Sequence, residues 1–483
     1  MIYNPFLPLD KYIPDGEPRV FNDRVYLFGS HDRENGNTFC ELDYEFFSAP
    51  VDDLNNWISK GINYKASQDA LYSKERPYIY APDVVRGNDG RFYLYYCLAG
   101  NKGDKGYYGP ISVAVADTPD GKYEYLGYVK YSDGRMFNKY VCFDPGLIND
   151  DGVIRLYYGT GMPRGISLPK VMVRLGANIF KNIYGKSKEE LLEKPGIWGP
   201  NMVTLCDDML TIKDDALRII FDSDFKGHAF FEGSSIRKIN NLYYFIYSSQ
   251  LNHELCYATS IYPDRGFKYG GTIVSAGDIG INGRKERDSL NAVGTTHGSI
   301  EYINGQWYVF YHRLTHGSDY SRQACAEPIV IEDDGSIKQV EISSSGLNGK
   351  PLIAKGKYPS VIACIITNGK MPRVSNKKYK KKIPMVKANY ITNIDNKTIV
   401  GYRYFDFVND RGSIDLDINN KGFGSIQIYS NNVLIGESNI DKNGRYIVSI
   451  PYEISNRNKQ ELIIKFKGEG TIDLYSLDFK EIS

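Results

Sequence analysis

The sequence has few of the features that indicate redox chemistry, membrane insertion or nucleic-acid binding. Its seven cysteines stand far apart along the chain, so neither a zinc knuckle nor a CxxC redox site is predicted. No apolar run reaches the roughly 18 residues that a membrane-spanning helix needs. Lys and Arg total 59 against 58 for Asp and Glu, and this balance argues against a nucleic-acid partner or an anionic membrane surface.

The N-terminal stretch MIYNPFLPLDKYIPDGEP lacks a basic segment followed by an apolar core, so no secretion signal is visible. An odd number of scattered cysteines is typical of a reducing compartment. We therefore expect a cytoplasmic protein. Tryptophan is scarce, with 3 residues, whereas the 40 tyrosines favour strands and suit flat, partly wet contacts such as those with sugar faces.

Five stretches of the chain share one design: an acidic residue or a histidine, several residues later a tight turn, and then an alternating, aromatic-rich strand. The opening residues are Asp15, Asp83, Asp144, Glu232 and His297. The turns that follow them are Asn22-Asp23, Asp89-Gly90, Asp151-Gly152, Asn240-Asn241 and Asn304-Gly305. Such turns between alternating strands predict β-hairpins.

The spacing of these repeats, 61 to 88 residues, leaves room for four strands and long loops in each unit. Because no helical periodicity accompanies them, we predict an all-β fold, a five-bladed β-propeller over residues 1–345. The first strand of each propeller blade lies innermost, so the five opening residues should converge on one end of the central channel. A two-sheet sandwich is the alternative arrangement of the same hairpins.

The rest of the chain shows three further patterns. The stretch KSKEELLEK predicts a short surface helix with Ser187 as its N-cap. After residue 345 the sequence becomes loop-rich and then lysine-rich, which we interpret as a linker over residues 346–387. Short strands separated by turn signals return over residues 388–483 and predict a small β-sandwich.

Three of the opening residues, Asp15, Asp83 and Glu232, are candidates for chemistry. Each has an ordinary interpretation, since Asp15 and Asp83 follow proline and suit turns, and Glu232 suits a channel rim. However, carboxylates that face one axis repel each other, which favours a functional reason for them. Glycoside hydrolysis needs a protonated carboxyl as acid, an ionised one as base, and a third that raises the pKa of the acid. Phe230 and Phe231 would limit hydration of Glu232 and favour it as the acid.

The chain resembles glycoside hydrolase family 43 over roughly residues 1–345. The resemblance rests on NPFLPLDKYIPDGEPRVF, YAPDVVRGNDGRFYLYY, GHAFFEGSSIRK and GTTHGSIEYINGQWYVFYHR. It implies a five-bladed propeller with inverting glycosidase activity, in which Asp15 is the general base, Asp83 modulates the pKa of the acid and Glu232 is the general acid. The family's base stands in an Asp-Pro context, whereas here the sequence is DGEP, so Glu17 is the alternative base.

The resemblance also implies that Arg322 reaches the sugar and that His297 lies on the axis beside a calcium ion or its waters. We expect Arg322, His297 and Phe231 to contact substrate. Calcium prefers oxygen ligands, so one imidazole is not a calcium site by itself. The ordinary alternatives are a core position for His297 and a strand-edge ion pair for Arg322, and Asp144 is interpreted as structural or axis-lining.

The C-terminal sandwich resembles a family 6 carbohydrate-binding module. Its Tyr402, Tyr404 and Phe405 would either stack on a sugar or belong to the core, and we expect the module to brace the propeller. The resemblance as a whole implies a β-xylosidase or α-L-arabinofuranosidase that hydrolyses plant cell-wall oligosaccharides without a cofactor for the chemistry. Because no secretion signal is visible, we expect small imported oligosaccharides as substrates and therefore an exo-acting enzyme. The alternatives are an arabinan- or galactan-degrading enzyme, a non-catalytic carbohydrate-binding propeller, and a protein-interaction scaffold.

Overall fold

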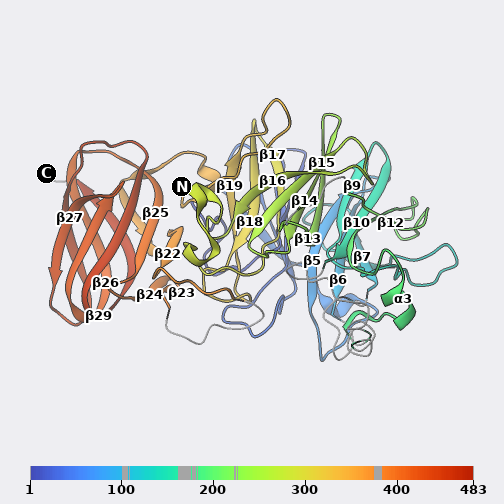
Figure 1. Cartoon of the computed structure of the whole chain (residues 1–483), viewed down its shortest axis with the longest axis horizontal. Helices are drawn as coiled ribbons and strands as arrows, with labels where there is room; N and C mark the ends of the chain where they lie inside the picture. Colours follow the sequence, from blue (N-terminus) through green and yellow to red (C-terminus); the bar gives the residue numbers. More distant parts are fainter. Residues whose placement is uncertain are drawn as a thin grey trace.

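The computed structural model describes residues 2–99, 107, 109–161, 176, 181, 183–221, 225, 227–374 and 383–481. The molecule is elongated, with a propeller at one end and a second β-rich domain, formed by the C-terminal part of the chain, at the other (Figure 1). The predicted fold class is therefore confirmed: a five-bladed β-propeller followed by a second β domain.

Each blade is an antiparallel sheet whose strands follow chain order. Among the described residues, the first four blades have four strands each and the fifth has three. Blade one contains β1 (Glu17–Phe21), β2 (Arg24–Phe28), β3 (Tyr44–Pro50) and β4 (Ile58–Tyr64). Blade two contains β5 (Ile79–Arg86), β6 (Phe92–Leu98), β7 (Ile111–Ala116) and β8 (Glu124–Tyr128). Blade three contains β9 (Gly146–Asp150), β10 (Val153–Thr160), β11 (Gly199–Thr204) and β12 (Leu217–Arg218).

Blade four contains β13 (Phe230–Ile239), β14 (Leu242–Ser249), β15 (Glu254–Ser260) and β16 (Lys268–Ser275). Blade five contains β17 (Ser299–Ile303), β18 (Gln306–Arg313) and β19 (Gln323–Ile329). The first strands contact one another in a closed ring, because β1 meets β5 and β17, β5 meets β9, β9 meets β13, and β13 meets β17. This confirms that the first strand of each blade is innermost.

The predicted turns join the inner strands to their neighbours. Left-handed φ values of 54° at Asn22, 52° at Asp151, 55° at Asn240 and 44° at Asn304 explain why Asn and Asp occupy these turns, since they tolerate this conformation better than most residues. In blade two, Gly90 has a φ of 85°. The five hairpins predicted from the sequence are all present.

Short helices occur in the connections. The predicted helix is α3 (Lys188–Leu192), and Ser187 caps it by accepting a hydrogen bond from the Glu190 N–H while the Glu190 carboxylate accepts from the Ser187 N–H. The 3₁₀ helices are η1 (Ala66–Gln68), η3 (Ile281–Gly283), η4 (Glu286–Asp288), η5 (Gly346–Asn348) and η6 (Ser360–Ile362). In the ranges that the structure describes, no helix is long and apolar enough to cross a membrane.

The second domain is built from ten strands around its own apolar core. They are β20 (Leu352–Ala354), β21 (Gly356–Pro359), β22 (Ile365–Thr367), β23 (Met385–Lys387), β24 (Tyr390–Ile394), β25 (Ile399–Phe407), β26 (Arg411–Ser430), β27 (Val433–Ile440), β28 (Gly444–Glu453) and β29 (Gln460–Glu481). The long β26 and β29 pair along most of their lengths and connect the other strands.

The segment predicted as a linker, 346–387, differs from that expectation. Its strands β20 and β22 pair with β25, and its β21 pairs with β29, so this part of the chain belongs to the second domain. The reason is its apolar side chains: Leu352, Tyr358 and Ile366 are buried in the core of the second domain. The lysine run that suggested a linker lies at 377–382, outside the described residues.

The two domains are joined by a packed interface. Cys364, Ile365 and Ile463 pack in one apolar cluster with Ile246 and Leu255 of blade four. At the edge of that cluster Arg403 donates to Asp278 of the propeller at 2.5 Å and to Glu461 of the second domain at 2.6 Å.

Of the three C-terminal aromatic residues considered for sugar stacking, two are core residues. Tyr402 and Phe405 are fully buried. The Tyr404 hydroxyl donates to Glu341 at 2.7 Å, across the joint between the domains. These positions favour the bracing role over the binding role.

Candidate active site

Five side chains from four blades and one connecting loop meet where the inner strands begin. They are Asp15, Asp144, Glu232, His297 and Arg322, which we call the Asp15 group. Nδ1 of His297 lies 3.9 Å from Oδ1 of Asp15 and 3.9 Å from Oδ2 of Asp144. Nη1 of Arg322 donates to Oδ1 of Asp15 at 2.8 Å. The predicted convergence on one end of the channel thus holds for Asp15, Asp144, Glu232 and His297.

The local backbone explains how Asp15 and Asp144 reach this point. Each lies two residues before its inner strand begins, and each has a left-handed φ, 57° for Asp15 and 47° for Asp144. Neither residue therefore continues the regular strand that follows it. Aspartate adopts this conformation more readily than most residues, so the backbone itself favours aspartate at both positions.

Glu232 is brought into the group by an irregularity in β13. The register between β13 and β14 shifts on both sides of Glu232, which pairs with Ser248. Such bulges re-aim side chains next to active sites. The next residue, Gly233, has a φ of 72°, and a Cβ there would stand 3.0 Å from the His297 ring. Its N–H donates to Oδ2 of Asp144 at 3.0 Å, so glycine permits both the turn and the close approach.

Asp15 is held as a carboxylate. Its burial raises its pKa, but Arg322, the two neighbouring histidines and a hydrogen bond with Ser30 together outweigh this, and the net pKa is lowered. The guanidinium is itself fixed, since it makes a bidentate pair with Asp32 at 2.8 and 3.0 Å and lies over the Phe39 ring at 4.9 Å. Asp15 is therefore ionised at neutral pH.

A neutral histidine supports the backbone of Asp15. Nδ1 of His312 accepts the Asp15 N–H at 3.2 Å, and its Nε2 lies 2.9 Å from the Thr295 carbonyl oxygen, to which it donates. Burial and the nearby charge of Arg322 lower the pKa of His312 to about 3. The 3.5 Å approach of His312 to the Asp15 carboxylate is therefore not an ion pair.

Glu232 has the opposite electrostatics from Asp15. Burial, and next the negative charge of Asp15, raise the pKa of Glu232 to about 8, so it is largely protonated at neutral pH. Burial also raises the pKa of Asp144 well above its usual range. The charge of His297 lowers this pKa, whereas the charges of Glu232 and Asp15 raise it further. Because charge repulsion is mutual, an ionised Asp144 in turn disfavours ionisation of Glu232.

The structure puts Asp83 in a different group. Its carboxylate accepts Arg19 Nε at 3.1 Å, Arg19 Nη2 at 2.6 Å and the Leu147 N–H at 2.7 Å. The alternative base, Glu17, is bound in the same way by Arg237 Nη1 at 2.7 Å. We call Glu17, Arg19, Asp83, Arg237 and Glu301 the Asp83 group.

The Asp83 group lies further along the inner strands than the Asp15 group. A cavity of about 340 Å³, lined among others by Arg19, Arg237 and Glu301, opens at the ends of these strands. The carboxylate that shares His297 with Asp15 is Asp144, and not Asp83 as expected.

The propeller region of the chain matches a known protein family. The sequence profile described as "Glycosyl hydrolases family 43" matches residues 3–337. The chain belongs to this family. The family 43 region therefore coincides with the propeller, and the protein is a glycoside hydrolase.

Among curated relatives, the xylosidase/arabinosidase of Thermoclostridium stercorarium is 40% identical over 476 residues, which cover 94% of this chain and 91% of that protein. Xylosidase/arabinosidase 43A of Humicola insolens is 29% identical and covers 68% of this chain and 96% of its own length. The family 43 propeller is thus shared with both, and the first relative also matches across the second domain.

Two solved structures bear on the fold. The GH43_1 enzyme from Xanthomonas citri, in complex with xylose, has a TM-score of 0.53 at 24% identity, and covers 69% of this chain and 92% of its own. A family 43 arabinoxylan arabinofuranohydrolase from Bacillus subtilis has a TM-score of 0.50 at 20% identity, covering 99% of this chain and 97% of its own. The second likeness extends over both domains.

Other residues of this site could not be identified from the sequence. Asp32 and His312 fix Arg322 and Asp15, yet no sequence spacing connects them to either partner. Tyr107 and Tyr184 lie near Glu232, whose charge contributes, after burial, to raising the pKa of both phenols. Phe231, expected to contact substrate, is buried beside Glu232 on β13. The signal that could have identified Asp144 is its place in the repeat.

Proposed function

We propose that this family 43 protein is an inverting, exo-acting glycosidase that hydrolyses β-xylosidic and α-L-arabinofuranosidic bonds in plant cell-wall oligosaccharides. The relative that is 40% identical over most of the chain carries the name xylosidase/arabinosidase, which supports both substrate classes. The observation that carries the proposal is the contrast in one site between Asp15, with a lowered pKa, and Glu232, with a pKa raised to about 8.

In the proposed reaction the anomeric carbon lies between Asp15 and Glu232. Asp15 takes a proton from water, the water oxygen bonds to the anomeric carbon, and Glu232 gives its proton to the departing glycosidic oxygen. The carbon–oxygen bond to the leaving sugar breaks, and that sugar departs as an alcohol. Exchange with solvent then returns Asp15 to the ionised form and Glu232 to the protonated form. Inversion requires roughly 6.5–9.5 Å between the two carboxyl groups so that the water fits.

Asp144 takes the role of pKa modulator that the sequence resemblance assigned to Asp83. Its carboxylate approaches His297 as Asp15 does, and its charge interacts with that of Glu232. Arg322, which is bidentate to Asp32 and also bonded to Asp15, is fixed in a position that suits contact with a sugar hydroxyl. His297, between the two aspartates, suits the same task.

No cofactor enters this chemistry. A calcium ion beside His297 finds a poor ligand set among the described residues, since Asp15 Oδ1 is engaged by Arg322 and Asp144 Oδ2 by the Gly233 N–H. Calcium takes 6–8 oxygen ligands, and an imidazole supplies none. These residues do not fit a directly coordinated calcium ion, and the proposed reaction does not involve one.

The proposed compartment is the cytoplasm, where imported oligosaccharides are the substrates. All seven cysteines are free, and six of them are buried, which supports a reducing environment. The second domain braces the propeller in this proposal, because two of its three candidate stacking aromatics belong to its core.

Hydrolysis of nitrophenyl β-xyloside, nitrophenyl α-L-arabinofuranoside and xylobiose tests the proposal. We expect turnover of all three, with NMR showing that the first-formed sugar has the anomeric configuration opposite to that of the substrate. Retention of configuration would refute the inverting mechanism. Inactivity on every pentoside, together with binding of xylo-oligosaccharides, would favour the non-catalytic propeller instead.

A further inference from the structure

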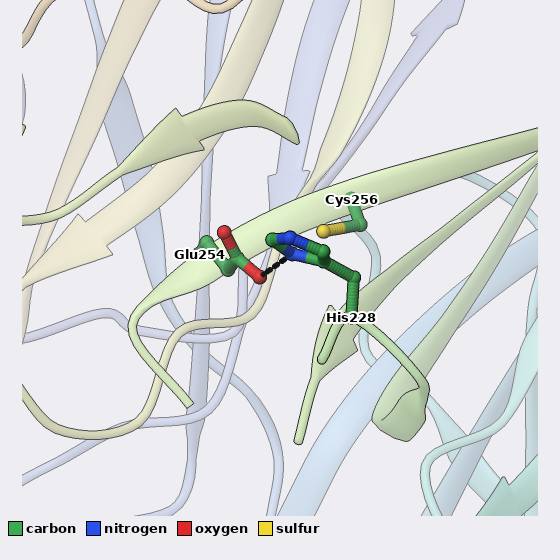
Figure 2. Close-up of side chains that lie close together, drawn as sticks. All are labelled: His228, Glu254 and Cys256. Carbon is green, nitrogen blue, oxygen red and sulfur yellow. Dashed lines mark hydrogen bonds and ion pairs between the residues drawn. The ribbon is translucent and has the colours of Figure 1, made fainter. Parts of the chain in front are cut away.

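A second cluster of reactive side chains lies on the fourth blade. It consists of His228, Glu254 and Cys256, and their ligand atoms all lie within 4.8 Å of one another. Figure 2 shows the three side chains converging, with Glu254 and Cys256 on one strand and His228 on the loop that precedes β13. The proposed hydrolysis uses none of them.

The strand geometry accounts for the pairing of Glu254 with Cys256. They are two residues apart on β15, and side chains at that spacing point to the same face of a strand. The imidazole of His228 is held against them by stacking on the Tyr269 ring, with a centroid distance of 5.2 Å and an interplanar angle of 18°. The Tyr247 hydroxyl donates to the carbonyl oxygen of His228 at 2.8 Å, which fixes its backbone.

Outer hydroxyl groups orient the carboxylate of Glu254. Ser249 Oγ donates to Oε1 at 2.6 Å, and Thr272 Oγ1 donates to Oε2 at 2.9 Å. Oε1 also lies 2.6 Å from Nδ1 of His228. The Cys256 thiol has weaker partners, Tyr269 Oη at 3.8 Å and Thr272 Oγ1 at 3.7 Å. In metal sites, outer hydrogen bonds of this kind hold the ligating groups in a fixed orientation.

An ion can reach the cluster from solvent. A cavity of about 420 Å³ is lined by His228, Glu254, Tyr269 and Thr272, among others. The side chain of His228 is 33% exposed, whereas that of Glu254 is 4% exposed. The three ligands therefore lie where the cavity meets the buried interior of the blade.

We propose that His228, Glu254 and Cys256 bind a zinc ion, with a water molecule from the cavity as the fourth ligand. One nitrogen, one oxygen and one sulfur donor suit tetrahedral zinc, whereas calcium and magnesium prefer oxygen alone. Zinc–ligand bonds of about 2.0–2.3 Å place tetrahedral donor atoms roughly 3.2–3.6 Å apart. Small rotations must therefore separate Nδ1 of His228 from Oε1 of Glu254, now 2.6 Å apart, and bring the donors that are more widely spaced together. The ion replaces the His228–Glu254 hydrogen bond, so the proton between these two groups moves to Nε2 of His228, or leaves to solvent where the ring is already protonated there. The thiol proton of Cys256 also leaves to solvent, and no group changes its oxidation state.

Zinc in this place ties two parts of the fourth blade together. His228 precedes β13, the strand that carries Glu232, and the other two ligands are on β15. Because the ion binds the folded chain through ligands from separate segments, we expect the melting temperature to rise with zinc concentration.

Titration of the chelator-treated full-length protein with Zn²⁺ by calorimetry, and with Co²⁺ by absorption spectroscopy, tests the site. We expect one equivalent of zinc to bind, and cobalt to give a near-ultraviolet thiolate charge-transfer band with the strong visible bands of tetrahedral coordination. Cys256→Ser should remove the charge-transfer band, keep hydrolase activity, and weaken zinc binding by more than about tenfold. His228→Gln tests the same site from its exposed side, and Thr272→Val should weaken binding by about 10–100-fold.

The matched control is Cys206→Ser, which removes a partly exposed cysteine outside the cluster and should leave binding unchanged. The absence of stoichiometric zinc binding would overturn the proposal and leave an ordinary His–Glu pair beside a buried thiol. Zinc binding that Cys256→Ser and His228→Gln leave unaltered would overturn it equally, since the ion would then bind elsewhere.

Discussion

Two groups of buried charges occur along the same propeller axis, and they differ in how their carboxylates are paired. In the Asp83 group, Arg19 bonds Asp83 through two nitrogens and Arg237 bonds Glu17. In the Asp15 group, Arg322 is divided between Asp15 and Asp32. Among the described residues, no arginine donates a hydrogen bond to Asp144 or Glu232.

This difference separates a structural use of buried charge from a chemical one. Burial raises the pKa of Asp83, but the charge of Arg19 opposes that increase and keeps the carboxylate in an ion pair, which suits architecture. A carboxyl that is buried near other acids, without its own cation, can change protonation near neutral pH, as a general acid must. The same inner strands therefore hold the propeller together at one level and carry the chemistry at another.

The largest expected effect comes from removing the acid. Glu232→Gln should lower kcat on xylobiose by about 10²–10⁴-fold, because general acid catalysis supplies a factor of that size. The loss should be much smaller on nitrophenyl glycosides, whose leaving groups need little protonation. Steady-state kinetics on the two substrate types measure this difference. Equal losses on both would argue against Glu232 as the proton donor.

The comparison between the groups is sharpest for the pair Asp144→Asn and Asp83→Asn. Asp144 and Glu232 are neighbouring buried carboxyls that repel each other when both are ionised, so they lose their protons in two coupled steps. Asp144→Asn removes the repulsion that delays the second step, so the alkaline limb of the kcat/KM profile moves to lower pH. Asp83→Asn should leave that limb in place and instead lower the free energy of unfolding by about 3–5 kcal/mol, because it breaks a buried ion pair. The reverse pattern would restore Asp83 as the modulator.

The two arginines provide the next contrast. The charge of Arg322 lowers the pKa of both Asp15 and Glu232, so Arg322→Gln should raise both. The base then needs a higher pH to ionise and the acid keeps its proton to a higher pH, so the whole activity profile moves to the alkaline side. Arg19→Gln, in the Asp83 group, should destabilise the fold without moving the profile. A profile that moves equally in both variants would contradict the separation.

The smallest effect on catalysis is expected at the joint between the domains. Arg403→Gln leaves Asp278 buried without its cation, so the free energy of unfolding should fall by about 3–5 kcal/mol while kcat stays unchanged. Arg411→Gln is the matched control, because its pair with Glu453 is exposed and screened by solvent, so the free energy of unfolding should stay close to that of the unchanged protein. Denaturant titration compares them, and a fall in kcat for Arg403→Gln would show that the second domain does more than brace.

Much of the fold could be predicted because local chemistry repeats along the chain. Each hairpin needs a left-handed residue at its turn, and Asn, Asp or Gly marks that position in every blade. The linker was misassigned because a lysine run dominates its sequence, while the apolar residues that enter the core of the second domain, such as Leu352 and Tyr358, are widely spaced.

The site was predicted in part, and the error at Asp83 has a geometric cause. Asp15 and Asp144 each lie six residues before the end of their inner strand, whereas Asp83 lies three residues before Arg86. The loop from β5 to β6 is five residues long, 87–91, whereas two residues join β1 to β2. Counting back from the turn therefore predicts the same position for Asp83 as for Asp15 and Asp144, whereas in the structure Asp83 lies further along its strand.

Contacts between distant segments were beyond the reach of the sequence. The pairing of Asp32 with Arg322 joins residues 290 positions apart, and the support of Asp15 by His312 spans 297 positions. No periodicity or motif records such contacts, because they arise only when the ring of blades closes. The pKa values of the site depend on these contacts, so they follow from the structure alone.

Titration of Glu232 itself tests the central claim most directly. Glutamate labelled with ¹³C at the side-chain carboxyl allows each carboxyl resonance to be followed by NMR against pH, and Glu232→Gln identifies the resonance of interest. This assignment is needed because burial also raises the pKa of Glu327, to about 7. We predict that the missing resonance titrates near pH 8 and moves to lower pH in Asp144→Asn but not in Asp83→Asn. A Glu232 resonance that titrates near 4.3, the ordinary value for glutamate, would contradict the account.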